Sequence, residues 1–255
     1  MATLVAVVPG DFAVVRRGRV GVAVLRILSA GTAQAVVDRI ATAYTSATGN
    51  GVNAEFSAVG AMKARVIAGE PVDVIVLTGA LIDELAASGH VAAGSRSDLG
   101  TVATGVAVRA GTPLPDVSEA RKLRGNLLAA TKVVCPDPAT ATAGKAVMQV
   151  LGRLGIVVEV QPRMQYFPNG YAAMKWLTES RGVLEMGITQ VTEILPNPGV
   201  TYVGPLPGDL KIKTVYSAGL AVRAQNAEEA MDFIARLTAP ASRAILAKAG
   251  YEFDE

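Results

Sequence analysis

The chain of 255 residues contains one cysteine and one histidine and carries little excess charge of either sign. A single cysteine excludes an internal disulfide, and one cysteine with one histidine cannot form the ligand set of a structural zinc site. The 24 basic and 22 acidic residues leave a net charge of +2, so nothing indicates the broad basic surface that binds nucleic acid. We therefore expect no metal, no cofactor and no nucleic-acid partner.

The two rare residues also give little support for nucleophilic catalysis. Cys135 ends the apolar run 133–136, which favours a buried small hydrophobe over a reactive thiol. His90 lies in the polar turn 88–90, which favours a solvated loop residue over a general base. The Gly-x-Ser-x-Gly motif is missing, and no Ser/His/Asp set can be built around a histidine in a turn.

Long apolar runs are missing as well. The N-terminal runs 2–8 and 20–28 are shorter than the roughly 18 to 20 residues of a membrane helix, and no clear small-x-small cleavage site follows them. We expect no membrane span and find no convincing export signal. Residues 1–24 are assigned as an N-terminal extension of uncertain role, and a genuine start at Met1 would make the protein cytoplasmic.

From residue 25 onward, helical and strand periods alternate, which is typical of an α/β protein with mainly parallel sheets. A helix is expected to place Val36, Val37, Ile40 and Tyr44 on one face and to end at Gly49. The near-continuous apolar run 72–77 predicts a strand that is covered on both faces. The 51% hydrophobic content allows a sizeable core.

Two long extended stretches, 99–109 and 213–224, interrupt this alternation. We interpret them as crossings between two lobes, with a hinge and a cleft between the lobes. The predicted boundaries are 25–103 and 217–255 for lobe one and 104–216 for lobe two.

One local pattern occurs four times: a strand end, a few small or hydroxyl residues, and then a helix. The four stretches are LSAGTAQAV (28–36), FSAVGAMK (56–63), DPATATAGK (137–145) and YFPNGYAAMK (166–175). Free N–H groups at helix starts offer neutral donors to an anion, and such loops lie where ligands bind in open α/β sheets. Four of them together predict an anion cleft.

Each junction also has a simpler interpretation, since Thr32, Thr142 and Asn169 would be good N-caps without any ligand. A phosphate loop is a poorer match, because Ala139 and Ala146 stand where that motif needs Gly and Ser or Thr. Lys63 and Lys145 follow small residues at two of the starts. They are either solvated lysines or cations that match extra negative charge on a ligand.

At these same residues the sequence resembles the molybdate-binding-type periplasmic solute receptors of ABC transporters. The resemblance covers about residues 25 to 253. It rests on LRILSAGTAQAVVDRIATAYTSATG, FSAVGAMKARVIAGEPVDVIVLTG, CPDPATATAGKAVMQVLGRLG, GVLEMGITQVTEI and LTAPASRAILAKAGYE. It implies the type II periplasmic-binding fold, in which two α/β lobes joined by two crossing strands close over an oxyanion. It also implies a periplasmic location and an ABC permease as a possible partner. We expect a monomer.

The resemblance carries a set of ligand-binding positions onto this chain. The predicted positions, including the two lysines and the neighbouring Thr140, are Gly31, Thr32, Val59, Gly60, Lys63, Thr140, Thr142, Ala143, Gly144, Lys145, Asn169, Gly170, Tyr171, Thr189 and Gln190. Two of them depart from the family pattern. A serine is replaced at Val59-Gly60, and the position of a late tyrosine falls near Thr189-Gln190.

These departures favour a carboxylate or another organic anion over molybdate or tungstate, because a desolvated tetrahedral dianion needs a near-complete shell of neutral donors. The first hypothesis is therefore a solute-binding protein that captures a small anion, with molybdate not excluded. An aconitate isomerase resembles the same family, so the alternative is an isomerase acting on an unsaturated tricarboxylate. In that case Lys145 is the candidate base.

Overall fold

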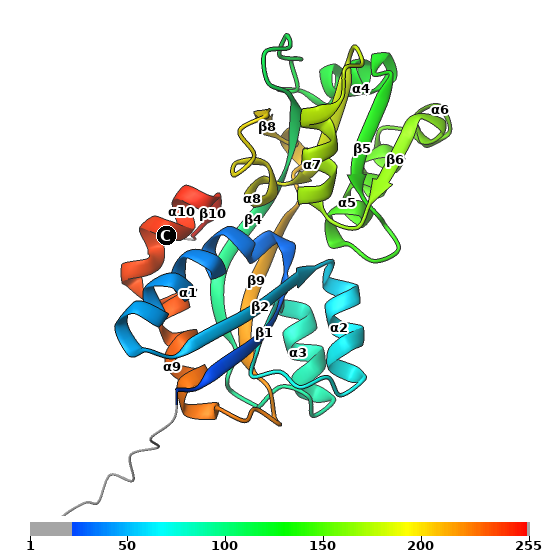
Figure 1. The fold of residues 1–255 in the computed structure, drawn as a ribbon. Helices are drawn as coiled ribbons and strands as arrows, with labels where there is room; N and C mark the ends of the chain where they lie inside the picture. The colour runs from blue at the N-terminus through cyan, green and yellow to red at the C-terminus, as the bar shows by residue number, and fades with distance from the viewer. Residues whose placement is uncertain (1–21, 254–255) are drawn as a thin grey trace, which may run out of the picture.

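The computed structural model describes residues 22–253 and shows an α/β protein of two lobes, as predicted (Figure 1). Most of the N-terminal extension assigned from the sequence, residues 1–21, lies outside the described residues. Each lobe has a hydrophobic core of its own, because the buried side chains separate into a cluster in lobe one and further clusters in lobe two.

Lobe one is built on the parallel strand order β2-β1-β3. Its elements are β1 (Val24–Ala30), η1 (Gly31–Ala33), α1 (Gln34–Thr48), β2 (Gly51–Ser57), α2 (Val59–Ile67), β3 (Val74–Thr78), α3 (Gly79–Ala87), α9 (Ala227–Thr238), η4 (Pro240–Ser242), α10 (Arg243–Ala249) and β10 (Tyr251–Glu252). Helices α1 and α9 cover one face of the sheet and α2 and α3 the other (Figure 1).

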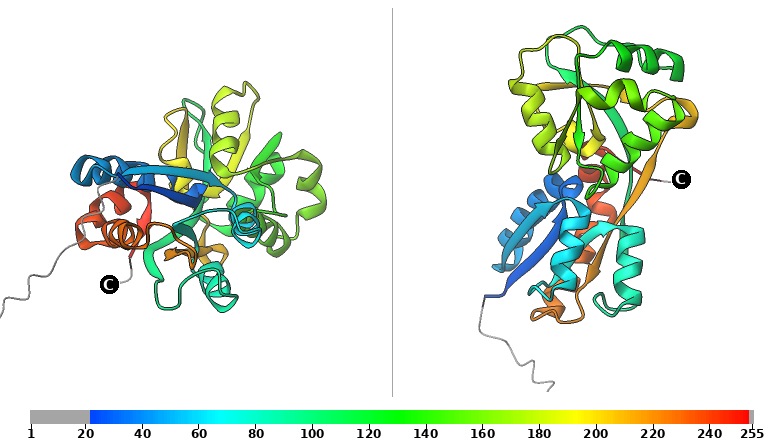
Figure 2. Two further views of the ribbon diagram at one scale, coloured as in Figure 1. Left: turned by 60° about the horizontal axis from the view of Figure 1, so that its bottom comes forward. Right: turned by 90° about the vertical axis from the view of Figure 1, so that its right-hand side faces the viewer.

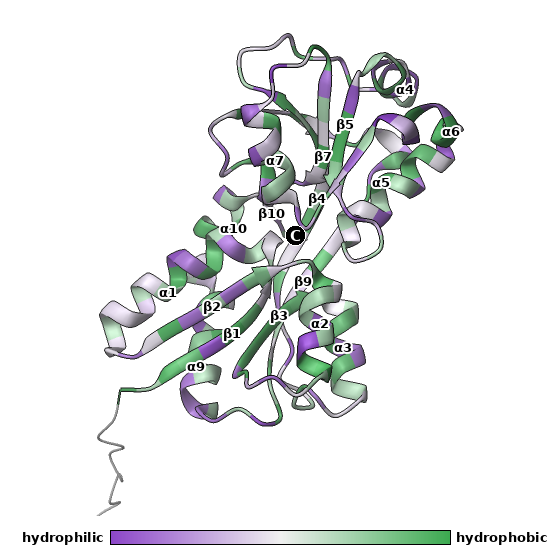
Figure 3. Ribbon diagram, turned by 45° about the vertical axis from the view of Figure 1, so that its right-hand side comes forward, coloured by the Kyte–Doolittle hydropathy of each residue, from purple (hydrophilic) through white to green (hydrophobic). Residues whose placement is uncertain are grey.

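The apolar pattern of lobe one decides which faces are buried. The four apolar residues predicted on one face of α1 are its buried residues, and the helix ends at Gly49 with a left-handed φ of 77°. Strand β3 is buried at every position, and Figure 3 shows it green along its length, while β2 alternates between green and purple. The difference arises because β3 is an internal strand covered on both faces, whereas β2 is an edge strand with one face exposed to solvent.

Lobe two repeats the arrangement with the parallel order β7-β5-β6. Its elements are α4 (Ala120–Ala129), β5 (Lys132–Pro136), α5 (Thr142–Arg153), α6 (Val157–Val160), η2 (Gln161–Arg163), β6 (Met164–Phe167), α7 (Gly170–Glu179), β7 (Glu185–Gln190), α8 (Val191–Ile194), β8 (Val200–Pro205) and η3 (Gly208–Leu210). Cys135 lies buried in this core, where desolvation raises the pKa of its thiol to about 12. It is a packing residue.

Two antiparallel strands, β4 (Ser97–Arg109) and β9 (Lys213–Leu220), join the lobes. Strand β4 pairs with β9 up to Ala103 and with β7 and β8 from Thr104 onward. The strands of residues 22–253 therefore form one ten-stranded sheet that runs through both lobes. The right-hand view of Figure 2 shows the lobes one above the other, with β9 in orange running between them. Within this part of the chain, no helix has the length and apolarity to cross a membrane.

Candidate functional site

A small cavity lies between the lobes at the carboxyl ends of the parallel strands. Its lining comes from the ends of β1, β2 and β5, from the helix starts that follow them, and from α7, α8 and β9. The lining residues are Ala30, Gly31, Thr32, Ser57, Ala58, Val59, Pro136, Ala141, Thr142, Ala143, Asn169, Gly170, Glu193 and Tyr216. Ligands of open α/β sheets bind at such strand ends.

Three helix starts in this lining have no side-chain cap. The N-cap residues of η1, α2 and α5 are Ala30, Ala58 and Ala141, and none of them can accept a hydrogen bond through its side chain. Alanine is among the poorest N-cap residues, so each start leaves backbone N–H groups to be satisfied by something else. All three alanines line the cavity. The lobes thus direct uncapped helix starts at one small space.

The fourth helix start, that of α7, is capped twice. The side chain of Asn169 accepts a hydrogen bond from the Ala172 amide at 2.9 Å, as the N-cap interpretation of the sequence predicted. The carboxylate of Glu193 accepts a second bond from the Gly170 amide at 3.1 Å. The donors at this start are therefore partly occupied by groups of the protein itself.

Glu193 belongs to α8 and is 3% exposed. Its Oε2 accepts a hydrogen bond from the Thr189 hydroxyl at 2.6 Å, and its Oε1 faces Gly31 of lobe one so closely that a Cβ there would lie 3.0 Å away. Desolvation raises the pKa of Glu193 to about 7, and the hydrogen bonds from Thr189 and Gly170 offset only part of that effect. The cavity therefore holds a carboxyl group that can change its protonation state near neutral pH.

Hydroxyl groups complete the lining. Thr32 donates to the phenol oxygen of Tyr216 at 3.1 Å, and both side chains are buried. Desolvation raises the pKa of Tyr216, so its phenol stays neutral and keeps an O–H group that can donate a hydrogen bond. Among the described residues, no side-chain hydrogen bond engages the hydroxyls of Ser57 and Thr142. The cavity thus offers neutral donors and one titratable carboxyl.

The lobes touch each other directly beside the cavity. The Gly60 amide of α2 donates to the Thr140 carbonyl of lobe two at 3.0 Å, and a Cβ at Gly60 would lie 2.8 Å from that oxygen. The space left between the lobes is about 20 Å³, which is room for about one water molecule. A larger ligand requires the lobes to separate, and the strands β4 and β9 are the hinge available for that motion.

Seven of the residues predicted from the sequence lie together in the lining. They are Gly31, Thr32, Val59, Thr142, Ala143, Asn169 and Gly170. Five others lie next to it in different roles: Gly60 and Thr140 hold the lobes together, Thr189 donates to Glu193, Gln190 is buried at the end of β7, and Gly144 packs against the end of β5. Tyr171 is not part of the lining, and its hydroxyl donates to the Thr192 carbonyl at 3.5 Å.

The structure does not bring the two predicted lysines to the cavity. Lys145 is exposed, on the face of α5 opposite its buried residues. Lys63 forms an ion pair with Glu84 of α3. Neither lysine lines the space between the lobes.

Sequence reasoning missed seven residues of the lining, and the three of them with polar side chains are Ser57, Glu193 and Tyr216. Ser57 stands at the end of β2, two residues before Val59, where this chain lacks the serine of the family pattern. Glu193 lies in the stretch GVLEMGITQVTEI, which carries part of the resemblance, but nothing in its local pattern marks it as buried. Tyr216 lies in the middle of the second crossing strand.

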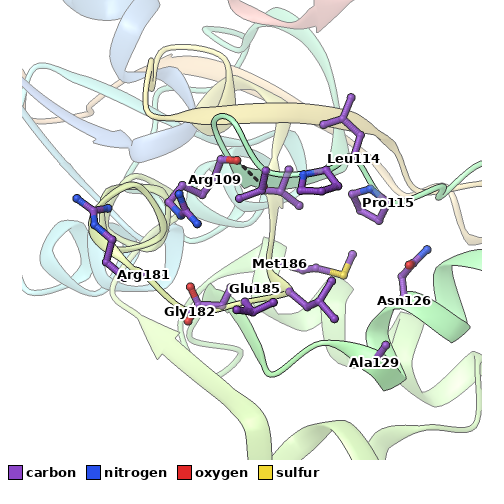
Figure 4. Close-up of a pocket in the computed structure, with 14 residues that line it drawn as sticks. Arg109, Leu114, Pro115, Asn126, Ala129, Arg181, Gly182, Glu185 and Met186 are labelled. Atoms are coloured by element: carbon purple, nitrogen blue, oxygen red, sulfur yellow. Dashed lines mark hydrogen bonds between the residues drawn. The ribbon is translucent and has the colours of Figure 1, made fainter.

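A second, larger cavity lies at the opposite end of lobe two (Figure 4). It is formed by the loop after β4, by α4 and by the loop before β7, and Figure 4 shows Leu114, Pro115 and Met186 among its lining residues. It contains none of the residues predicted from the sequence. Its lining is mainly apolar, so we take the cavity between the lobes as the candidate site.

Two lobes on one continuous sheet, with helix starts facing a cavity at the hinge, define a ligand-binding protein of the two-lobed periplasmic type. The sequence model of the bacterial extracellular solute-binding proteins matches residues 25–252, and the chain belongs to that family. The resemblance noted from the sequence is thereby confirmed.

Three known proteins show the range of this similarity. An aconitate isomerase from Pseudomonas sp is 30% identical over 223 residues, which is 82% of this chain and 80% of that protein. The periplasmic molybdate-binding protein of Azotobacter vinelandii superposes with a TM-score of 0.77 at 21% identity, covering 91% of this chain and 100% of that one. The sulfate-binding protein SubI of Mycobacterium tuberculosis gives a TM-score of 0.73 at 16% identity, covering 90% and 86%.

Proposed function

We propose that the cavity between the lobes is a binding site for a small anion, with an organic carboxylate preferred over a tetrahedral oxyanion. One observation carries the proposal: the uncapped helix starts of η1, α2 and α5, each with an alanine as N-cap, meet at this cavity. Uncapped helix starts present backbone N–H groups together with the positive end of the helix dipole, and both favour an anion. At α2 the Gly60 amide is already paired with the Thr140 carbonyl, so η1 and α5 carry most of this argument.

The preference for a carboxylate rests on the lining. The three uncapped starts come from different elements, so separate carboxylate groups of one ligand can each take one of them. The similarity to an aconitate isomerase supports the same ligand class.

In this proposal the protein acts as the receptor of an ABC transporter. The anion enters between the separated lobes, the lobes close by bending at β4 and β9, and a membrane permease recognises the closed form. The family of extracellular solute-binding proteins supports a location outside the cytoplasmic membrane.

A thermal-shift screen tests the proposal. The ligands are molybdate, tungstate, sulfate, phosphate and a panel of di- and tricarboxylates that includes both aconitate isomers. A ligand at about 100 times its dissociation constant stabilises the fold by about 2.7 kcal/mol, which gives a clear rise in melting temperature. We expect the largest rise with a carboxylate. If none of these anions raises the melting temperature, the proposed function is wrong.

Glu193 favours a second candidate function, an isomerase acting on an unsaturated tricarboxylate. Its carboxylate would take a proton from a methylene carbon next to a substrate carboxylate, and the electron pair would move into the conjugated system. The protonated Glu193 would return the proton to the far carbon of the former double bond. The double bond thereby migrates with no atom gained or lost. A pKa of about 7 suits a group that both accepts and donates a proton.

An ultraviolet assay for conversion of trans- to cis-aconitate separates the two functions. For an isomerase, Glu193→Gln is expected to lower turnover by about 10² to 10⁴-fold, the usual contribution of a general base. Glu179→Gln is the matched control, because Glu179 is an exposed glutamate at the other end of α7. If the wild type turns over no unsaturated di- or tricarboxylate, the isomerase candidate falls and the receptor proposal stands.

A further inference from the structure

The larger cavity at the opposite end of lobe two has a charged side and an apolar side. Its volume is about 300 Å³, which lies within the range of small-molecule binding sites. Figure 4 shows Arg109 and Arg181 toward one side of the cavity and Leu114 and Pro115 toward the other. A cavity with this division fits a molecule that has both a charged group and an apolar part.

Arg109, the last residue of β4, is a cation without a partner. Its side chain is half-buried, and its Nε is buried with no hydrogen-bond acceptor. In the part of the chain that the structure describes, its guanidinium group takes part in no ion pair and in no hydrogen bond. A buried donor without an acceptor is costly, and more so when the group is charged. Arg109 is therefore positioned for an acceptor that these residues do not supply.

The other two charged side chains of the lining have partners within the protein. Arg181 donates to the carbonyls of Thr178 and Ser180 at 3.4 and 3.1 Å, at the end of α7. Glu185 accepts a hydrogen bond from the Ser180 hydroxyl. Two guanidinium groups and one carboxylate leave the lining with one positive charge in excess. A ligand with a single carboxylate matches that charge, and carboxylates are preferred partners of arginine.

The rim of the cavity carries exposed apolar side chains. Leu114, Val183 and Leu184 line the cavity and are 61%, 73% and 61% exposed. Leu184 has a left-handed φ of 55°, which is uncommon for leucine, and its carbonyl accepts a hydrogen bond from the Thr131 amide at 3.0 Å. Large apolar side chains that gather at the surface mark binding sites more often than isolated ones do. The rim therefore favours a ligand with a hydrocarbon chain.

We propose that this cavity is a second binding site, which takes an amphipathic monocarboxylate. Arg109 binds the carboxylate, and the apolar lining covers the hydrocarbon chain. The site is separate from the cavity between the lobes, so the proposal does not depend on the anion-binding function proposed above. Since one water molecule takes up about 30 Å³ of the liquid, the cavity has room for about ten non-hydrogen atoms. Octanoate has that size, one negative charge and an apolar chain.

Calorimetric titration of the full chain with sodium octanoate and with octanamide at pH 8 tests the proposal. Octanamide has the same hydrocarbon chain and a neutral amide group. We expect the wild type to bind octanoate about tenfold more tightly than octanamide, because only octanoate forms a charged hydrogen bond with Arg109. Arg109→Gln should lose this preference. The matched control is Arg121→Gln, since Arg121 is an exposed arginine of α4 outside the lining.

A second variant tests the cavity itself. Ala129 lines the cavity and is exposed at the end of α4, so Ala129→Phe fills part of the space without disturbing the core. It should weaken the binding of both octanoate and octanamide. Thr142→Pro, which alters the cavity between the lobes, should leave the octanoate affinity unchanged. A failure at the second site therefore leaves the anion-binding function intact.

The contrary results are distinct. If octanoate does not bind the wild type, or binds no better than octanamide, the proposed site is wrong. A preference for octanoate that persists in Arg109→Gln overturns the role of Arg109. Undiminished octanoate affinity in Ala129→Phe places the ligand elsewhere and overturns the site. Should Arg109→Gln not fold, the comparison of the two ligands in the wild type and in Ala129→Phe decides.

Discussion

The starts of α5 and α7 face the same cavity from the same lobe, yet one is uncapped and the other is capped by side chains. Helix α5 begins after Ala141 with no side-chain cap, whereas α7 begins with Asn169 and Glu193 as acceptors for its amides. A missing cap costs about 0.5 to 2 kcal/mol of stability. The chain bears that cost at the start of α5, where we propose that an anion binds, and avoids it at α7, where the protein supplies its own acceptor. Free and occupied helix starts thus divide the cavity into a receiving side and an excluding side.

The largest effect is expected on the excluding side, in the pH dependence of stability. Glu193 has a pKa of about 7 in the folded protein against 4.5 when unperturbed, so the folded state holds its proton more tightly. Stability must therefore fall as the pH rises from about 4.5 to 7, by about 3 kcal/mol for this group. Glu193→Gln should remove that loss. Urea unfolding at pH 4.5, 6 and 8 measures it, with Glu179→Gln as control. Equal pH slopes in wild type and Glu193→Gln would refute the assignment.

The next effect concerns the receiving side. Thr142→Pro removes one amide N–H and one hydroxyl at the first position of α5, where proline is tolerated. Affinity for the anion that stabilises the wild type most should fall by about 1 to 3 kcal/mol, with the fold intact. Thr142→Val isolates the hydroxyl contribution. Lys145→Gln, on the exposed face of the same helix, should change affinity by less than about 0.5 kcal/mol. Calorimetric titration compares the three, and an unchanged affinity in Thr142→Pro would exclude α5 from the site.

The smallest effect is expected when a substitution gives the start of α5, on the receiving side, an acceptor of its own. Ala141→Asp adds a carboxylate at the N-cap of α5, in the way that Glu193 serves α7. The fold should gain about 1 kcal/mol, and anion affinity should fall, because the cap competes for the same N–H groups. Thermal melts with and without the ligand measure both changes. A variant with higher stability and undiminished affinity would show that the ligand does not use the start of α5.

Much of the fold follows from local pattern. The helical period fixed the buried face of α1, and the continuous apolar run predicted the doubly covered β3. The same period also accounts for Lys145. Val147, Val150 and Leu151 define the buried face of α5, and Lys145 falls on the other side of the helix, with Gln149. Two lysines close to helix starts in the sequence are therefore not close to the cavity in space.

The site could be predicted only where its donors are local. Backbone donors at helix starts follow from small residues between a strand and a helix, so Gly31, Thr142 and Gly170 could be predicted from the sequence. Glu193 was not, because its environment is made by contacts to Gly170 in α7 and to Gly31 in lobe one, which are remote in sequence. An acidic residue in a short helix normally faces solvent, whereas contacts with Gly170, Thr189 and Gly31 bury this one.

The change of partners along β4 has a consequence for protein engineering. Ala103 and Lys213 are paired neighbours on adjacent antiparallel strands, and the whole of lobe two lies between them in the chain. Lobe two is thus an insertion into what would otherwise be a β-hairpin of lobe one. Adjacent ends of this kind tolerate the removal or exchange of an inserted domain. A two-residue turn such as Asn-Gly could join the two strands directly and leave lobe one as a minimal, continuous α/β unit.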